Sequence, residues 1–281
     1  MTIMARDDHH HAPGSTDART PVLALHAAAS SAVQWQGLTD YLRGRHRVFA
    51  PDLPGYGTTR MLPVRQIRDI ARQIANAKAG QAPLHVVGHS LGAAVALELA
   101  ILCPGLVRSL TLIEPMVFDL LRDGDPSDRA LFGTLLKQAE GMLASVARQD
   151  NDGGMRTYVD FWYGAGAWRR TSVGLRERLS RQTLQVASDL MAALAGPGDP
   201  TRYNCIRCPT LLLKGLQSPV ASLRATEIVA FAIPRARLMM MGDAGHMAPL
   251  TDPHIVDPLV GRHLSSVDGR GQMQPVLYCA A

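Results

Sequence analysis

The stretch Val-Gly-His-Ser-Leu-Gly-Ala at residues 87–93 decides the fold. It follows a short apolar run at residues 84–87 and leads into a long apolar run at residues 93–102, an order that predicts strand, sharp turn and helix. Glycines stand two residues before and two residues after Ser90, where the two backbones nearly touch and leave no room for side chains. Such a turn lifts the serine hydroxyl clear of the sheet and places it at a helix N-terminus, whose free N–H groups can stabilise an oxyanion. The sequence therefore predicts a nucleophilic serine at residue 90.

Six short apolar runs predict buried strands. Each is unbroken rather than alternating, as expected for strands that are covered on both faces of a parallel sheet. The runs occupy residues 22–26, 47–51, 84–88, 109–113, 210–214 and 237–241. Helical patterns lie between or after them, at residues 32–42, 64–77, 90–102, 220–232 and 253–264. The alternation predicts an α/β fold with a mostly parallel central sheet flanked by helices.

One region breaks this alternation and shows only helical periodicity. An all-helical insertion after the fourth predicted strand favours a lid over the carboxyl edge of the sheet, where ligands bind in open α/β sheets. We expect a core of residues 19–115 and 199–265, a lid at 116–198, and tails at 1–18 and 266–281. Most aromatic residues of the lid are explained by its own packing, but some can face the cleft. The residues predicted to line an apolar substrate pocket are Phe161, Trp162, Trp168 and Met247.

Composition excludes several classes of protein. The 281 residues carry a formal charge of +5, and the basic residues are scattered instead of forming the stripe that nucleic acid requires. No apolar stretch is long enough to span a bilayer, and the first 20 residues hold no signal-peptide block, so a cytoplasmic protein without membrane insertion is expected. Cys205 and Cys208 have C-x-x-C spacing but lack a second ligand pair, and the run of histidines at residues 9–11 lies in the predicted tail. We therefore expect a small-molecule substrate, no metal site and no cofactor.

A nucleophilic serine needs a base and two oxyanion donors. His246 follows the last predicted strand in Gly-Asp-Ala-Gly-His-Met-Ala-Pro at residues 242–249, which puts it at the same sheet edge as Ser90. A structural loop histidine is the alternative. The backbone N–H of Leu91, directly after the serine, is one expected donor. The other is the N–H of Ala28, in the alanine-rich loop after the first strand.

Four motifs in this order resemble those of the α/β-hydrolase superfamily. They are His-Ala-Ala-Ala-Ser at residues 26–30, Asp-Leu-Pro-Gly-Tyr-Gly at 52–57, Gly-His-Ser-Leu-Gly at 88–92 and Gly-His at 245–246, and the resemblance covers residues 21–265. Members of the superfamily usually have His-Gly where this chain has His26-Ala27. They also usually begin with an antiparallel hairpin, for which the residues before Val22 are too few and too polar. The resemblance therefore implies a hydrolase whose sheet is shortened at that edge.

The acid that orients the histidine is the least obvious part of the site. In most relatives it follows the strand after the lid, but here no Asp or Glu occurs between that strand and Glu227. Some members of the superfamily, certain haloalkane dehalogenases among them, carry the acid after the strand before the lid, where this chain has Glu114. We expect Glu114 to be the acid, with capping of the first lid helix as the alternative reading. Asp243 and Asp252 are the reserve candidates.

Together these features predict a serine hydrolase that cleaves an ester of a small to medium apolar acyl group through an acyl-enzyme. Ser90 is the expected nucleophile, His246 the base and Glu114 the orienting acid. Thioester, amide or carbon–carbon bond hydrolysis and a cofactor-free haloperoxidase use the same machinery and stay open as alternatives. A ligand-binding protein on the same fold is a further alternative, although it would have no need of both Ser90 and His246.

Overall fold

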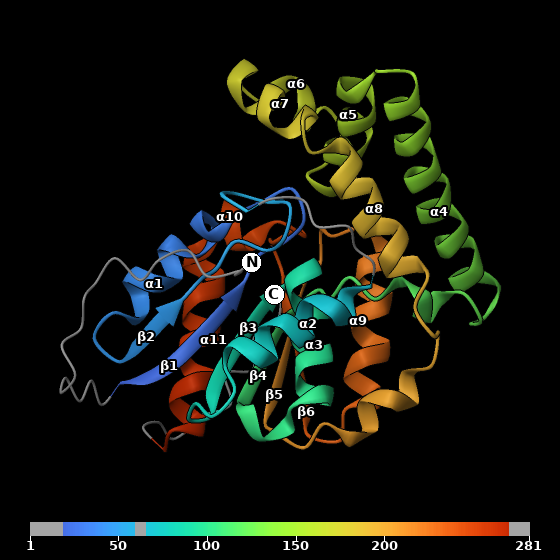
Figure 1. Cartoon of the computed structure of the whole chain (residues 1–281). Helices are drawn as coiled ribbons and strands as arrows, with labels where there is room; N and C mark the ends of the chain where they lie inside the picture. The colour runs from blue at the N-terminus through green and yellow to red at the C-terminus, as the bar shows by residue number, and fades with distance from the viewer. Residues whose placement is uncertain (1–18, 60–65, 270–281) are drawn as a thin grey trace.

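Six parallel strands form the central sheet of the protein (Figure 1). In the computed structural model, which describes residues 19–59 and 66–269, each predicted apolar run forms a strand. The strands are β1 (Thr20–Leu25), β2 (His46–Phe49), β3 (Leu84–His89), β4 (Val107–Ile113), β5 (Thr210–Gly215) and β6 (Ala236–Met241). Their order in the sheet is β2-β1-β3-β4-β5-β6, and every neighbouring pair is parallel. All carboxyl ends therefore lie at one edge, and the predicted α/β fold class is confirmed.

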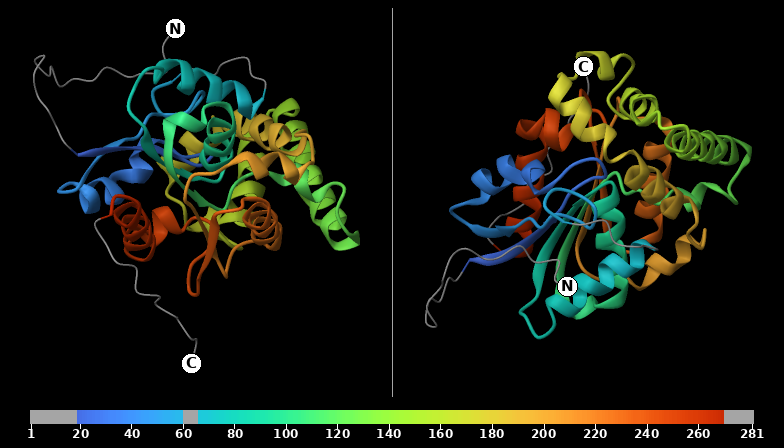
Figure 2. Two further views of the ribbon diagram at one scale, coloured as in Figure 1. Left: turned by 90° about the horizontal axis from the view of Figure 1, so that it is seen from below. Right: turned by 45° about the horizontal axis from the view of Figure 1, so that its top comes forward.

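The helices that alternate with these strands cover both faces of the sheet (Figure 2). On one face lie α2 (Ile67–Ala77), α3 (Leu91–Leu102) and α9 (Val220–Ala232), and on the other lie α1 (Gln36–Leu42) and α11 (Pro253–Val267). The predicted helix at 32–42 begins with the 3-10 turn η1 (Ala32–Trp35), and the short helix α10 (Ala248–Thr251) was not predicted. Two further 3-10 turns, η2 (Pro104–Leu106) and η4 (Pro200–Cys205), precede β4 and β5.

Strand residues alternate between two apolar clusters because successive side chains point to opposite faces. Val86 and Leu112 pack toward α3, whereas their neighbours Val87 and Ile113 pack toward α11, and all four are fully buried. This two-sided burial is why the strands read as continuous apolar runs in the sequence.

Strand β2 forms one edge of the sheet in the described part of the chain. Within the described residues, β1 pairs only with β2 and β3, and both pairings are parallel. The predicted tail at 1–18, including the histidines at 9–11, lies outside the described residues. Of the tail predicted at 266–281, residues 266–267 belong to α11 and Asp268 is its C-cap, whereas residues 270–281, including Cys279, lie outside the described residues.

Helices α4 to α8 are inserted between β4 and β5 and rise together above the body that holds the sheet (Figure 1). They follow the 3-10 turn η3 (Phe118–Leu121) and comprise α4 (Pro126–Ala147), α5 (Asn151–Trp162), α6 (Ala167–Arg170), α7 (Val173–Ser180) and α8 (Thr183–Leu194). We call them the helical insertion. Across residues 19–59 and 66–269, no helix combines the length and the apolar character needed to cross a bilayer.

Candidate active site

Ser90 lies at a sharp turn between β3 and α3. Its backbone angles are φ +52° and ψ −114°, a strained conformation for a residue with a side chain. A Cβ on Gly88 would lie 2.5 Å from the carbonyl oxygen of Gly92, and a Cβ on Gly92 would lie 2.1 Å from the carbonyl oxygen of Leu25. Both glycines are therefore required by the close approach of strand and helix, as the spacing around Ser90 predicts.

The carboxylate of Glu114 contacts the imidazole of His246. Glu114 directly follows β4, His246 lies in the loop after β6, and Nδ1 of His246 donates a hydrogen bond of 2.7 Å to Oε2 of Glu114. Because Nδ1 carries the proton in this bond, Nε2 is left as the basic nitrogen. The structure gives no hydrogen bond between His246 and the reserve carboxylates Asp243 and Asp252. The N-caps of the next two helical segments are Val117 and Asp125, so Glu114 is not a helix cap.

Three further donors hold the Glu114 carboxylate. Oε1 accepts from the backbone N–H of Gly215 at 2.7 Å and from the hydroxyl of Ser218 at 2.6 Å, and Oε2 accepts from the hydroxyl of Ser222 at 2.6 Å. Burial by itself raises the pKa of Glu114, but the hydrogen bond and charge of His246, together with the two serine hydroxyls, outweigh it and lower the pKa to about 2. Glu114 is therefore ionised at neutral pH although its side chain is fully buried.

His246 lies beside the turn that carries Ser90. His89 donates from Nε2 to the backbone oxygen of His246 at 2.8 Å, and the two ring centroids are 5.0 Å apart. Burial, followed by the charge on His246, lowers the pKa of His89 to about 3, so this neighbour of Ser90 is neutral. The ring of Trp162, from α5, lies 4.4 Å from the His246 ring. Ser90 Oγ and His246 are not joined by a hydrogen bond in this structure. Proton transfer therefore requires the two side chains to move closer together. Such long separations are common in active sites before substrate binds.

Two backbone N–H groups near Ser90 are available to an oxyanion. Among the described residues, the structure gives no acceptor to the N–H of Leu91 or of Ala28. Their neighbours are engaged, since the N–H of Gly92 donates to His26 O at 3.1 Å and the N–H of Ala27 donates to a glutamine side chain at 3.2 Å. The backbone N–H groups of Leu91 and Ala28, the two expected oxyanion donors, are thus left without an acceptor among the described residues.

Asp52 orders the loop that borders this site. Its Oδ1 accepts from the N–H of Ala32 at 2.8 Å and its Oδ2 from the N–H of Thr58 at 2.9 Å. The backbone N–H of Leu53 donates to Nε2 of His26 at 2.8 Å, which ties the same loop to the segment that follows β1. These contacts brace the backbone around Ala28.

The fold and the residues at the carboxyl ends of its strands correspond to a known family. A sequence profile of the alpha/beta hydrolase family matches residues 22–257. The chain belongs to this family.

Several curated relatives of this hydrolase are named as esterases or lipases. A pimeloyl-[acyl-carrier protein] methyl ester esterase of Methylococcus capsulatus is 33% identical over 181 residues, which cover 64% of this chain and 68% of that protein. Lipase 3 of a Moraxella species is 24% identical over 258 residues, which cover 88% of this chain and 78% of the lipase. This member of the family is accordingly a hydrolase of the ester-cleaving kind.

Solved structures show the same fold. A thermophilic esterase from Thermogutta terrifontis superposes with a TM-score of 0.68 at 22% identity, covering 88% of this hydrolase and 90% of that chain. The enol-lactonase from Burkholderia xenovorans superposes with a TM-score of 0.71 at 18% identity, covering 90% and 94%. At these identities the likeness concerns the fold alone.

Three of the four predicted pocket residues of the hydrolase line one cavity. Phe161, Trp162 and Met247 border a cavity of about 660 Å³ that reaches His246. Trp168 lies elsewhere: its side chain is buried in the helical insertion, and the guanidinium carbon of Arg176 lies 5.9 Å from the centroid of its ring.

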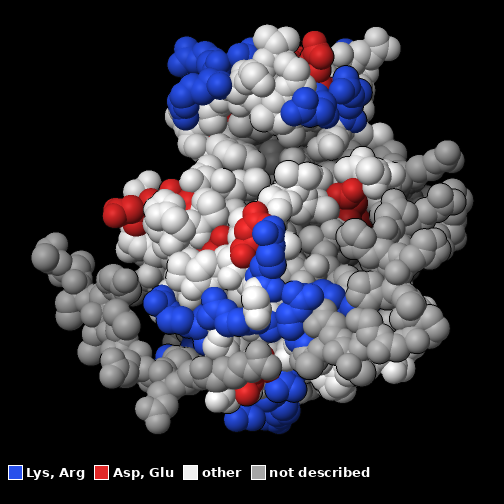
Figure 3. All heavy atoms as spheres, turned by 90° about the vertical axis from the view of Figure 1, so that its left-hand side faces the viewer, with Lys and Arg blue, Asp and Glu red and all other residues white. Residues whose placement is uncertain are grey.

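Arginines gather where the helical insertion meets the loop after β1. A second cavity, of about 900 Å³, is lined by Arg170, Arg178 and Arg181 from the insertion and by Ala29 and Ser31 from the loop. Figure 3 shows Lys and Arg side chains clustered over the end of the insertion that holds α6 and α7. We call Arg170, Arg178 and Arg181 the arginine rim. A concave surface with this charge favours anionic ligands.

The structure adds residues that sequence reasoning missed. Ser218 and Ser222 hold Glu114 in place, and His89 holds the backbone of His246. The signal available in the sequence was the pair of hydroxyl residues after β5, in the segment where relatives usually carry the acid and this chain has none.

Proposed function

We propose that this hydrolase cleaves carboxylic esters through an acyl-enzyme on Ser90, with His246 as the base and Glu114 as the orienting acid. The observation that carries the proposal is the 2.7 Å hydrogen bond from His246 Nδ1 to the ionised Glu114, formed beside the strained turn that holds Ser90. The same bond leaves His246 Nε2 free to accept the serine proton.

The reaction then follows from the geometry. Ser90 Oγ attacks the acyl carbon while His246 Nε2 takes its proton, and Glu114 stabilises the imidazolium that forms. The N–H groups of Leu91 and Ala28 stabilise the tetrahedral oxyanion. The alcohol leaves with the proton from His246, which next deprotonates a water molecule that releases the acid and regenerates Ser90. Each proton in this reaction moves between Ser90, His246, water and the substrate.

The walls of the two cavities support a substrate class. Phe161, Trp162 and Met247 suit an apolar acyl chain of small to medium length. The arginine rim suits a negatively charged group at the other end of the substrate. The relative from Methylococcus capsulatus is named for the ester pimeloyl-[acyl-carrier protein] methyl ester. That ester combines an apolar chain with a carrier protein. The cytoplasmic location expected from the sequence stays a prediction.

A panel of p-nitrophenyl esters and a fluorophosphonate probe test the proposal. The parent chain is expected to turn over short and medium acyl esters, and to prefer a member of the panel that bears a carboxylate at the end of its acyl chain. Ser90→Ala should abolish turnover and labelling, whereas Ser188→Ala, which changes an exposed serine on α8, should leave both unchanged. A folded parent chain that neither reacts with the probe nor cleaves any ester would favour the ligand-binding alternative.

A further inference from the structure

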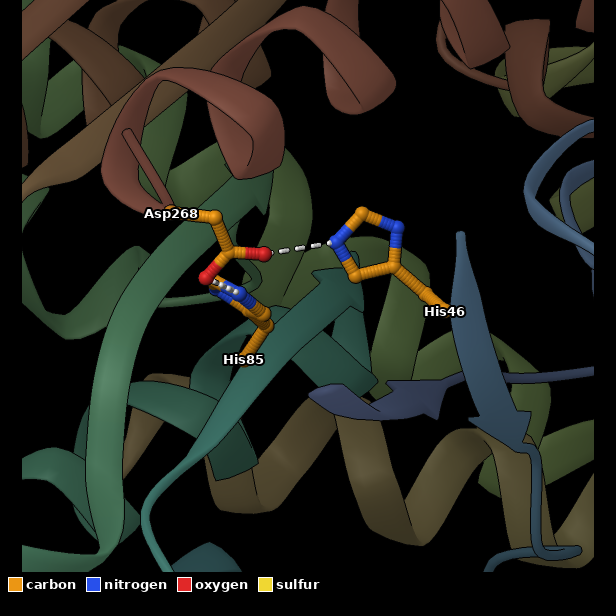
Figure 4. Close-up of side chains that lie close together, drawn as sticks. All are labelled: His46, His85 and Asp268. Carbon is orange, nitrogen blue, oxygen red and sulfur yellow. Dashed lines mark hydrogen bonds and ion pairs between the residues drawn. The ribbon is translucent and has the colours of Figure 1, made fainter. Parts of the chain in front are cut away.

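Three side chains able to bind a metal meet at the amino end of the sheet, away from Ser90 (Figure 4). His46 begins β2, His85 is the second residue of β3, and Asp268 is the C-cap of α11. Their side chains are 0%, 0% and 2% exposed. Nε2 of His46 lies 3.1 Å from Oδ2 of Asp268, and Nε2 of His85 lies 3.3 Å from Oδ1 of Asp268. The Nε2 atom of each imidazole thus points at the carboxylate of Asp268.

We propose that His46, His85 and Asp268 bind a divalent transition-metal ion of the zinc class. Two imidazole nitrogens and one carboxylate oxygen are a ligand set that Zn²⁺ accepts, with water in the fourth position. At metal–ligand bonds of about 2.0–2.1 Å, the ligand atoms of a tetrahedral site lie roughly 3.3 Å apart. The 3.1 Å from His46 Nε2 to Asp268 Oδ2 is close to this spacing, and all the ligand atoms, His85 Nε2 included, lie within 4.8 Å of one another. A small closing movement of the side chains completes the site.

The surroundings favour the protonation states that metal binding requires. Nδ1 of His85 lies 2.6 Å from Oγ of Ser109, and a proton held there leaves Nε2 free as the ligand atom.

Arg108 contacts one oxygen of the Asp268 carboxylate and leaves the other available to a metal ion. Its Nε donates to Oδ1 of Asp268 at 2.9 Å, which leaves Oδ2 as the oxygen that a metal ion would take. The competing explanation is a metal-free clasp, in which both imidazoles carry a proton on Nε2 and donate to Asp268. Titration with Zn²⁺ separates the two explanations.

The consequence of a metal here is structural. His85 and Ser90 lie five residues apart on one strand and turn, about 16 Å at the rise of an extended chain. A bound ion would join β2, β3 and the end of α11 at the edge of the sheet opposite the proposed catalytic residues. The inference therefore stands independently of the proposed function.

Zinc and cobalt titrations of the full chain test the proposal. The histidines at residues 9–11 are first replaced (His9→Ala, His10→Ala, His11→Ala), because they could bind metal by themselves. After treatment with a chelator, calorimetry is expected to show one Zn²⁺ per chain with submicromolar affinity, together with a rise in Tm. Co²⁺ should give the intense visible bands of four-coordinate cobalt without a sulfur-to-metal band.

Variants assign the ligands. His85→Gln and Asp268→Asn should each weaken Zn²⁺ binding by more than about 100-fold, and Ser109→Ala by about 10-fold. His254→Ala, on an exposed part of α11, and His246→Gln, at the other edge of the sheet, should leave the affinity unchanged.

Two results would overturn the proposal. The first is that the parent chain does not bind Zn²⁺, or that binding survives both His85→Gln and Asp268→Asn. Either outcome would leave the metal-free clasp as the explanation for these three side chains. The other is a six-coordinate or sulfur-bound cobalt spectrum in the parent chain, a measurement that does not depend on how well any ligand variant folds.

Discussion

At the scale of single residues, the site rests on a buried charge with several donors. Glu114 is fully buried yet ionised because Ser218, Ser222, Gly215 and His246 all donate to it. A carboxylate of this kind can hold an imidazole in one tautomer and stabilise its charged form. Glu114 also has a positive φ, +44°, which turns its side chain away from the path of the strand. Two strained residues, Ser90 and Glu114, therefore stand directly after the last paired residues, His89 and Ile113, of neighbouring strands β3 and β4.

Glu114→Gln is expected to lower kcat for a p-nitrophenyl ester by about 10³–10⁴-fold, because an amide neither fixes the tautomer of His246 nor stabilises its charge. The matched control is Glu227→Gln, a carboxylate on α9 that pairs with Lys214 and should leave kcat near that of the parent. Ser222→Asp in the Glu114→Gln chain should restore part of kcat, since Ser222 Oγ lies 3.2 Å from His246 Nδ1. An active Glu114→Gln enzyme together with an inactive Asp243→Asn enzyme would move the acid role to Asp243.

The low pKa of Glu114 also predicts how stability depends on pH. Folding lowers this pKa from 4.5 to about 2, so the contribution is complete above pH 4.5 and is lost as the pH falls toward 2. The shift corresponds to roughly 3 kcal/mol. Chemical unfolding should show Glu114→Gln less stable than the parent at pH 6, with a difference that shrinks at pH 3. A difference that stays constant over this range would mean that the charge of Glu114 does not carry the effect.

At the scale of elements, a polar contact fastens the helical insertion to the loop that borders the site. The hydroxyl of Tyr56, in the loop after β2, donates to Oδ2 of Asp189 on α8 at 2.5 Å. Nε2 of Gln185, one helical turn earlier, donates to Oδ1 of Asp189 at 2.9 Å. Gly55 makes the approach possible, because a Cβ there would lie 2.3 Å from Oε1 of Gln185. The loop and α8 are thus held together at a buried point beside Ala28 and Ala29.

Asp189 should make the parent chain less stable as the pH rises. Burial raises its pKa from 3.8 to about 6, although Tyr56 and Gln185 partly oppose the shift. The folded state therefore holds a proton that the unfolded state has lost between these values, and the free energy of unfolding falls by roughly 2–3 kcal/mol over that window. Asp189→Asn should remove this part of the slope in chemical unfolding between pH 4 and 7. Asp257→Asn serves as the comparison, since burial also raises the pKa of Asp257 to about 6.

If Asp189→Asn leaves the slope unchanged while Asp257→Asn flattens it, the proton is held at Asp257 and the contact between α8 and the loop does not titrate. An unchanged slope in both variants would show that neither carboxyl is protonated in the folded protein near pH 5.

At the scale of the whole molecule, the helical insertion closes over the candidate active site. Ser90 and His246 are each 2% exposed, and Trp162 packs its ring over the imidazole. The cavity lined by Trp162 reaches His246 from the side of the insertion. The role of these helices as a lid stays a prediction, and it would require Trp162 or part of α5 to move when substrate reaches Ser90.

Trp162→Ala should shift the enzyme toward bulkier esters. Removing the indole opens space above His246, and a change of this size in an apolar pocket alters discrimination by about 10–200-fold. The measurement is the ratio of kcat/KM for a long and a short p-nitrophenyl ester, which should rise in Trp162→Ala and less in Trp162→Phe. Trp168→Ala is the matched control, because Trp168 lies within the insertion and borders neither cavity. An equal rise in both tryptophan variants would point to general loosening of the insertion.

The sequence by itself determined the elements, and it singled out two candidate reactive residues by their local signatures. Continuous apolar runs predict buried parallel strands, and glycines on both sides of Ser90 predict the turn, because these features depend on neighbours along the chain. His246 followed from its place after the last strand.

Only the tertiary structure decided which groups meet across the sheet. The register of β3, β4 and β5 brings Glu114 to Ser218 and Ser222, more than one hundred residues later. It is Glu114, and neither Asp243 nor Asp252, that accepts a hydrogen bond from His246. The packing of β2, β3 and the end of α11 brings His46 and His85 to Asp268, three residues that share no sequence motif. A hydrogen bond or a metal site depends on separations of a few ångströms, and those are set by packing between segments rather than by the pattern within any one of them.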